Sequence, residues 1–240
     1  MKIILTENQF NSLLQTEGVA QLLQESLRDS KNFEKLIKTV KHLLTIGVAV
    51  TSIIAAINKT DLPTNEKQFL VNMVAEAQVM AEKAKADSVY QDKVNACRSY
   101  MEYALTNQGY SMKSTGLKPE TLVDVSMETG FDLPFLMAVA HQESCFGATP
   151  RAKRTNSVFS EGSYDDGRNV TTYDDPNDSV MGYVELLNRS YIVNGKTLFD
   201  LLKPGAFING AGNRYAQDRN YEGKIKNLRN RIIRRHPELV

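Results

Sequence analysis

The sequence predicts a mainly α-helical protein, with a helical N-terminal domain over residues 1–110 followed by an α+β domain with a small β-hairpin lobe over residues 111–240. Apolar residues recur at intervals of three and four through most of the chain, which is typical of amphipathic helices. The segment 156–173 instead has Asp-Asp-Gly between short β-prone pieces, which indicates a hairpin. The Gly-, Ser- and Pro-containing stretch 106–119 is typical of a linker and gives the domain boundary.

The N-terminal domain is expected to contain helices near residues 6–15, 32–44 and 60–88, the first of them capped by Thr6. The fifteen residues from Leu43 to Ile57 carry no charge. A helix that crosses a bilayer needs about 20 apolar residues, so this segment is short for a membrane span. We expect a helix buried among its neighbours, and the alternative is a segment that inserts into a membrane or docks on a partner.

The second domain is expected to begin with a helix from Pro119 to the terminating Gly130. Asp132 is a fitting N-cap for the next helix, whose apolar sequence ends in Glu143. Further helices are expected over residues 176–191, 195–207 and 221–236, after the predicted hairpin.

Composition excludes several classes of protein. The hydrophobic fraction is 42% and the net charge is +1, so the chain as a whole is neither membrane-like nor strongly charged. The two cysteines, Cys97 and Cys145, have no disulfide-framework or metal-site spacing, and we expect no metal and no cofactor. The basic residues concentrated in 214–235 are interpreted as a solvated helix face, with attraction to an anionic polymer as the alternative. No specific nucleic-acid recognition is expected.

Glu143 is the strongest candidate for catalysis. It closes the apolar run 135–140 at the C-terminal end of a predicted helix. The negative end of the helix dipole and apolar surroundings both favour a protonated carboxyl, which a general acid needs near neutral pH. Because many helices end in glutamate without any such role, this position alone is a weak signal.

Three ordered sequence elements strengthen the interpretation. The first has Glu143, Ser144, Gly147, Asn156 and Phe159; the second has Tyr173, Ser179 and Tyr183; the third has Tyr215, Ala216, Asp218, Tyr221, Lys224 and Ile225. Together they resemble the motifs of the bacterial and phage glucosaminidases of glycoside hydrolase family 73, within the lysozyme-like superfamily. The resemblance covers about half the chain, roughly residues 117–233, and leaves residues 1–110 outside it.

The resemblance implies a lysozyme-like fold for the second domain and a role for each matching residue. Glu143 would be the catalytic acid, and Tyr215 would position a water or the N-acetyl group of the substrate. Asn156, Phe159, Tyr173 and Tyr221 would bind substrate, although packing in the core is the alternative for Phe159 and Tyr215 and the preferred interpretation for Tyr221. A second carboxylate often lies in the β-lobe of the family. Of Glu161, Asp165 and Asp166, we expect Asp165 or Asp166 to face the cleft.

The sequence departs from the family where Cys145 and Phe146 stand in place of the usual glycine and tryptophan. The implied activity is hydrolysis of the β-1,4 glycan of peptidoglycan by an endo-β-N-acetylglucosaminidase. The alternatives are a muramidase, a lytic transglycosylase, or a catalytically degenerate structural protein of a virion.

The N-terminus lacks the pattern of a signal peptide, because its apolar run is three residues long and Glu7 follows. We therefore expect a phage protein made in the host cytoplasm that acts on the bacterial cell wall, either as an endolysin or as a virion-associated lysin. Its partner would be the glycan strand of peptidoglycan. The N-terminal helices would contact phage structural proteins or a membrane.

Overall fold

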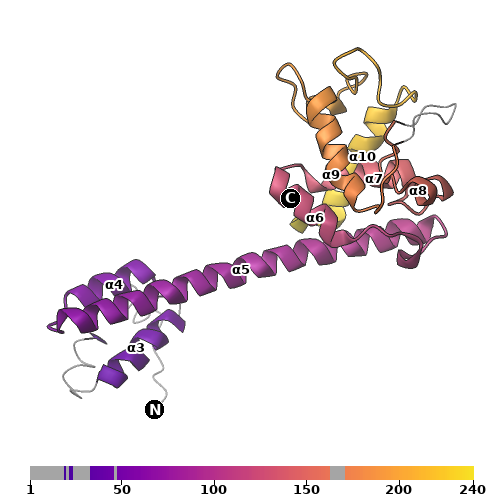
Figure 1. Ribbon diagram of the computed structural model, residues 1–240. Coiled ribbons are helices and arrows are strands. Elements are labelled where there is room, and N and C mark those ends of the chain that lie inside the picture. Colours follow the sequence, from indigo (N-terminus) through magenta and orange to yellow (C-terminus); the bar gives the residue numbers. More distant parts are fainter. Residues whose placement is uncertain (1–18, 20–21, 24–32, 46–47, 163–170) are drawn as a thin grey trace. The chain divides into compact units, whose positions relative to one another are not determined.

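The computed structural model describes residues 19, 22–23, 33–45, 48–162 and 171–240, and this part of the chain is mainly helical (Figure 1). The expected helix at residues 6–15 lies outside the described residues. The chain divides into two compact units, Met1–Asp87 and Ser88–Val240. The second unit therefore includes residues 88–110, which the sequence analysis placed with the N-terminal helices.

The first unit contains α3 (Phe33–Thr45), α4 (Val50–Asn58) and the beginning of α5 (Thr64–Asn107). The uncharged stretch from Leu43 to Ile57 is divided between the end of α3 and α4. Its buried residues belong to a core that also includes residues of α3 and α5 and two residues that precede α3: Val19, Leu23, Leu36, Val40, Leu43, Val48, Ile53, Ala56, Ile57, Leu70 and Val74. In the described part of the chain, every helix is too short or too polar to cross a membrane.

The second unit begins with the remainder of α5 and continues through α6 (Pro119–Thr129), α7 (Leu133–Ser144), α8 (Pro150–Thr155), α9 (Asp178–Leu186) and α10 (Tyr221–Arg235). Short helical turns accompany these helices: η1 (Met112–Ser114), η2 (Leu187–Tyr191), η3 (Asp200–Leu202) and η4 (Pro237–Leu239). The helix expected over residues 195–207 is only the turn η3, because the chain leaves helical conformation at Lys203, and Pro204 and a left-handed Gly205 follow.

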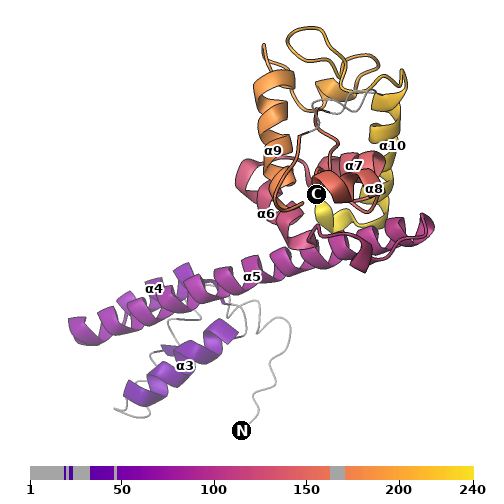
Figure 2. The same ribbon diagram turned by 45° about the vertical axis from the view of Figure 1, so that its right-hand side comes forward.

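Helix α7 is the central element of this unit. Every side chain from Leu133 to Ala140 is buried, as expected for a helix that is apolar on all sides. Asp132 caps its N-terminus by accepting a hydrogen bond of 2.8 Å from the Phe135 amide. Arg229 of α10 binds both oxygens of Asp132, at 2.8 and 2.6 Å. This ion pair joins the N-terminal end of α7 to α10, and α7 packs against both α6 and α10 (Figure 2).

The described residues do not support the predicted β-hairpin lobe. Residues 156–162 and 171–173 contain no strand, and residues 163–170, with the predicted turn, lie outside the described part. Backbone hydrogen bonds join Thr171 to Glu161 and Tyr173 to Thr155, at 3.1 and 2.9 Å, but in different registers. Positive φ angles at Asn156 and Ser160, 51° and 55°, turn the chain between them and prevent a regular ladder.

Candidate functional site

Glu143 lies in the last turn of α7, and the chain reverses directly after it. Cys145 and Phe146 adopt left-handed backbone conformations, with φ of 49° and 59°. Glycine is favoured in left-handed backbone because it has no Cβ. Cys145 therefore stands at a position whose backbone conformation suits the glycine that is usual in the glucosaminidases. The Ser144 hydroxyl donates to the Val158 carbonyl at 2.6 Å and holds the reversal in place.

The carboxyl group of Glu143 is largely buried and has hydroxyl partners. Tyr221, the first residue of α10, donates its hydroxyl to Oε1 at 2.5 Å. The Ser160 side chain and the charge of Arg151 also favour the ionised form of this carboxyl. Burial is the largest influence and raises the pKa of Glu143 above its ordinary value, against these opposing contributions. The group therefore holds its proton to a higher pH than an exposed glutamate does.

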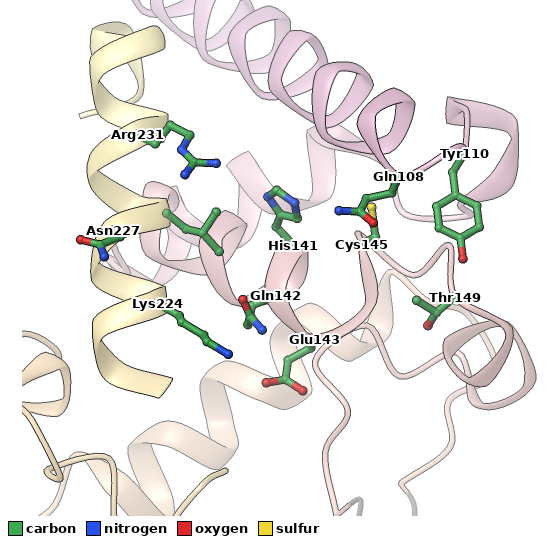
Figure 3. A pocket seen from close by; sticks show the side chains of 11 residues that line it. Gln108, Tyr110, His141, Gln142, Glu143, Cys145, Thr149, Lys224, Asn227 and Arg231 are labelled. Carbon is green, nitrogen blue, oxygen red and sulfur yellow. The ribbon is translucent and has the colours of Figure 1, made fainter. Parts of the chain in front are cut away.

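A cavity of about 560 Å³ lies beside Glu143 (Figure 3). It is formed by the end of α5, the last turn of α7 and one face of α10. Its lining is mostly polar: Gln108, Tyr110, His141, Gln142, Glu143, Cys145, Thr149, Lys224, Asn227, Leu228 and Arg231. Among these residues Glu143 is the only carboxylate. The cavity has the size of a small-ligand site, and Glu143 lies in its wall.

The hydroxyls of Tyr215 and Tyr221 have different partners in the structure. Tyr221 hydrogen bonds to Glu143, whereas the Tyr215 hydroxyl donates to the Phe159 carbonyl at 2.6 Å. The Tyr215 ring stacks on Phe207, with ring centroids 4.7 Å apart. Burial raises the pKa of both tyrosines, so both hydroxyls remain donors at neutral pH. Tyr221 therefore supports the candidate acid, and Tyr215 supports the backbone behind it.

Phe159 and Asn156 have structural contacts. The Phe159 ring is fully buried and stacks on Tyr183, with centroids 4.2 Å apart and planes 3° from parallel. The Asn156 amide donates to the carbonyls of Tyr173 and Asp174, at 2.9 and 3.0 Å. Neither side chain lines the cavity.

Tyr173 contacts a second buried carboxyl, that of Glu161. The tyrosine hydroxyl donates to Oε2 at 2.7 Å, and Oε1 has no hydrogen-bond partner among the described residues. Glu161 is 5% exposed, and burial raises its pKa to about 7 despite the opposing effects of Tyr173 and Arg189. Neither residue lines the cavity beside Glu143. Asp165 and Asp166, the preferred candidates for a second carboxylate, lie outside the described residues.

Helix α10 contributes to the cavity, which its sequence did not predict. Lys224, Leu228 and Arg231 recur at helical intervals of four and three, so they lie on one face of α10. That periodicity is visible in the sequence, but the sequence does not show which face of the basic helix lines the cavity.

His141 also lines the cavity. Its Nδ1 lies 3.1 Å from the Tyr100 hydroxyl, and burial lowers its pKa, so the ring is neutral at neutral pH.

Comparison of the chain with family models, curated proteins and solved structures finds no match. A largely buried carboxyl with a raised pKa, beside a polar cavity and with a tyrosine hydroxyl on one of its oxygens, is suited to donate a proton to a bound leaving group when it is protonated. The residues that the structure describes form no cluster of His, Cys, Asp or Glu able to hold a metal ion.

Proposed function

We propose that this protein is a peptidoglycan hydrolase that cleaves β-1,4 glycosidic bonds of the cell-wall glycan as an endo-β-N-acetylglucosaminidase. The observation that carries the proposal is the buried carboxyl of Glu143, whose raised pKa suits a general acid and which borders a cavity of about 560 Å³. The three ordered sequence elements that resemble glucosaminidases support the same activity. The lysozyme-like fold implied by that resemblance is part of the proposal.

In the proposed reaction, Glu143 donates its proton to the glycosidic oxygen as the bond to the sugar carbon breaks. Because Tyr221 donates to Oε1, the acidic proton is assigned to Oε2. The hydrogen bond from Tyr221 then stabilises the carboxylate that proton transfer leaves behind, and the Ser160 side chain also favours the ionised form. The Tyr221 hydroxyl needs no rearrangement during the step, because it already donates to the carboxyl.

The positive charge that develops on the sugar requires a partner. Glu143 is the one carboxylate among the described residues of the cavity lining, so we propose that the substrate's N-acetyl group or a bound water meets this charge. Asp165 or Asp166 as a second carboxylate remains a prediction.

Product analysis by mass spectrometry tests the proposed bond specificity. Peptidoglycan digested by the wild-type protein should carry new reducing N-acetylglucosamine ends, and digestion with Glu143→Gln should produce none. New reducing muramic ends would instead assign a muramidase, and anhydro-muramic ends a lytic transglycosylase. No new ends with either protein would favour a degenerate structural domain.

We further propose that the protein is made by a phage in the host cytoplasm and reaches the wall at lysis or inside the virion. In that setting the N-terminal helices would contact phage structural proteins or a membrane. Immunoblotting of purified virions separates the two routes, because only a virion-associated lysin is retained through purification.

A further inference from the structure

We propose that the cavity beside Glu143 is a subsite for a carboxylate-bearing substituent of the glycan strand, with Arg231 and Lys224 as its anion-binding residues. This inference rests on the proposed function and adds a specificity to it. The cavity lining contains two cations, Arg231 and Lys224. Proton donation by Glu143 does not require them, so they are free to serve another purpose.

The two cations lie on the same face of α10, seven residues apart, which is two helical turns. Figure 3 shows both side chains extending from α10 toward α7, on which Gln142 and Glu143 lie. The cavity therefore has the candidate acid at one part of its wall and two positive charges along the facing helix.

Arg231 is the more available of the two cations. Lys224 lies 2.5 Å from a carboxylate oxygen of Asp218, in an ion pair that is about half exposed. By contrast, Arg231 forms no ion pair within the described part of the chain. Two other arginines of this unit are paired: Arg229 binds Asp132, and Arg214 binds the buried Glu222. An arginine left unpaired beside a cavity is suited to bind a carboxylate through two parallel hydrogen bonds.

The other groups of the lining fit the same type of ligand. His141 is neutral at neutral pH, because burial and the Arg231 charge both lower its pKa, so it adds no second charge beside Arg231. Gln108, Gln142 and Asn227 supply amide donors and acceptors. With Glu143 protonated, the lining carries a net positive charge from Lys224 and Arg231.

The chemistry of peptidoglycan provides such a ligand next to the bond that is cleaved. N-acetylglucosamine has no charged substituent, whereas muramic acid carries a lactyl ether. Its carboxylate is either free or extended by a stem peptide with carboxylates of its own. The subsite would thus recognise the sugar that bears the lactyl group and orient the strand relative to Glu143.

Binding measurements on the Glu143→Gln protein test this subsite without turnover. The ligands are a neutral N-acetylglucosamine oligomer, a peptide-free glycan strand with lactyl carboxylates, and a strand that retains its stem peptides. Each is titrated into Glu143→Gln alone, into Glu143→Gln/Arg231→Ala, and into the control Glu143→Gln/Arg234→Ala. Arg234 is an exposed arginine of the same helix that does not line the cavity.

We expect Arg231→Ala to weaken binding of the carboxylate-bearing strands by roughly tenfold and that of the neutral oligomer by less than twofold. Arg234→Ala should change neither. A larger effect on the peptide-free strand identifies the lactyl carboxylate as the ligand, and a larger effect on the other strand identifies the stem peptide. Equal weakening for all three ligands, or none, overturns the proposal.

Hydrolysis by the otherwise unmodified protein separates this result from the proposed function. The wild-type protein could release reducing ends while Arg231→Ala weakens binding of all ligands equally or not at all. That result would overturn the carboxylate subsite and leave the proposed hydrolase activity intact. If Arg231→Ala discriminates but the wild-type protein cleaves no strand, the subsite stands in a protein that binds without hydrolysing.

Discussion

Glu143 and Tyr221 are joined by a hydrogen bond of 2.5 Å, and this contact lowers a pKa that burial raises. In Tyr221→Phe the carboxylate loses a donor, so the pKa of Glu143 should rise further. A general acid works only while protonated, so activity is lost as pH rises through this pKa. The alkaline limb of the pH–rate profile should therefore move to higher pH in Tyr221→Phe.

Tyr215→Phe is the matched control, since its hydroxyl donates to the Phe159 carbonyl and not to Glu143. Leaving that carbonyl without a donor should cost about 1–3 kcal/mol in the free energy of unfolding. The alkaline limb should stay at its wild-type position. If the limb stays in place for Tyr221→Phe as well, Tyr221 does not act through the ionisation of Glu143.

Glu161 should make the protein less stable as pH rises. Its pKa is about 7 in the folded state against an ordinary 4.5, so the folded state binds more protons between these values. Stability should therefore be highest below about pH 4.5 and fall by at most about 3 kcal/mol up to pH 7, as far as this group is concerned. Urea unfolding at several pH values should show a flatter profile for Glu161→Gln. An unchanged profile would contradict the buried ionisable state.

At the level of single residues, the sequence singled out Glu143 as the candidate acid. It did not predict which groups the other candidate residues contact. The order of motifs singled out Tyr215, Tyr221, Asn156 and Tyr173, because these residues recur in the resemblance. It could not distinguish them, since the roles depend on which hydroxyl or amide meets which acceptor across the fold. Glu161 was a candidate for the second carboxylate, but Asp165 and Asp166 were preferred. It is buried and accepts a hydrogen bond from Tyr173, and turn propensity does not indicate that contact.

At the scale of elements, the pairing of α7 with α10 positions the site. Asp132 caps α7 and also binds Arg229, and both side chains are only 16% exposed. Asp132→Ala removes the cap and leaves the arginine without its partner, which should cost about 2–4 kcal/mol in the free energy of unfolding. Asp132→Asn keeps a capping oxygen and should lose less. Equal unfolding midpoints for wild type and Asp132→Ala would contradict this role.

The helices were the most predictable elements, because amphipathic periodicity, Pro119, Gly130 and the Asp132 cap are local signals. The helix expected over residues 195–207 was wrong because an apolar pattern does not outweigh the Pro204-Gly205 break. The hairpin flanks are not strands because Asn156 and Ser160 take left-handed conformations, which a turn motif farther along the chain does not indicate.

At the scale of the whole molecule, the compact unit that carries the site begins within α5. Its core includes buried residues of that helix upstream of residue 111: Val94, Ala96, Cys97, Tyr100, Met101, Ala104 and Leu105. We expect a fragment of residues 88–240 to unfold cooperatively and to retain hydrolysis. A fragment of residues 111–240 exposes the surface that these side chains cover and should not fold stably. Circular dichroism melting compares the two, and equal stability would place the boundary near residue 110.

The measurement that tests the central claim most directly is the rate at which reducing ends appear when purified peptidoglycan is incubated with wild-type protein or Glu143→Gln. Glutamine keeps the shape of the side chain but cannot donate the acid proton, so folding should be preserved, as a matched melting curve would verify. We expect steady release by the wild-type protein and a loss of at least about 100-fold in the variant. Equal rates for the two proteins, or no release by either, would contradict it.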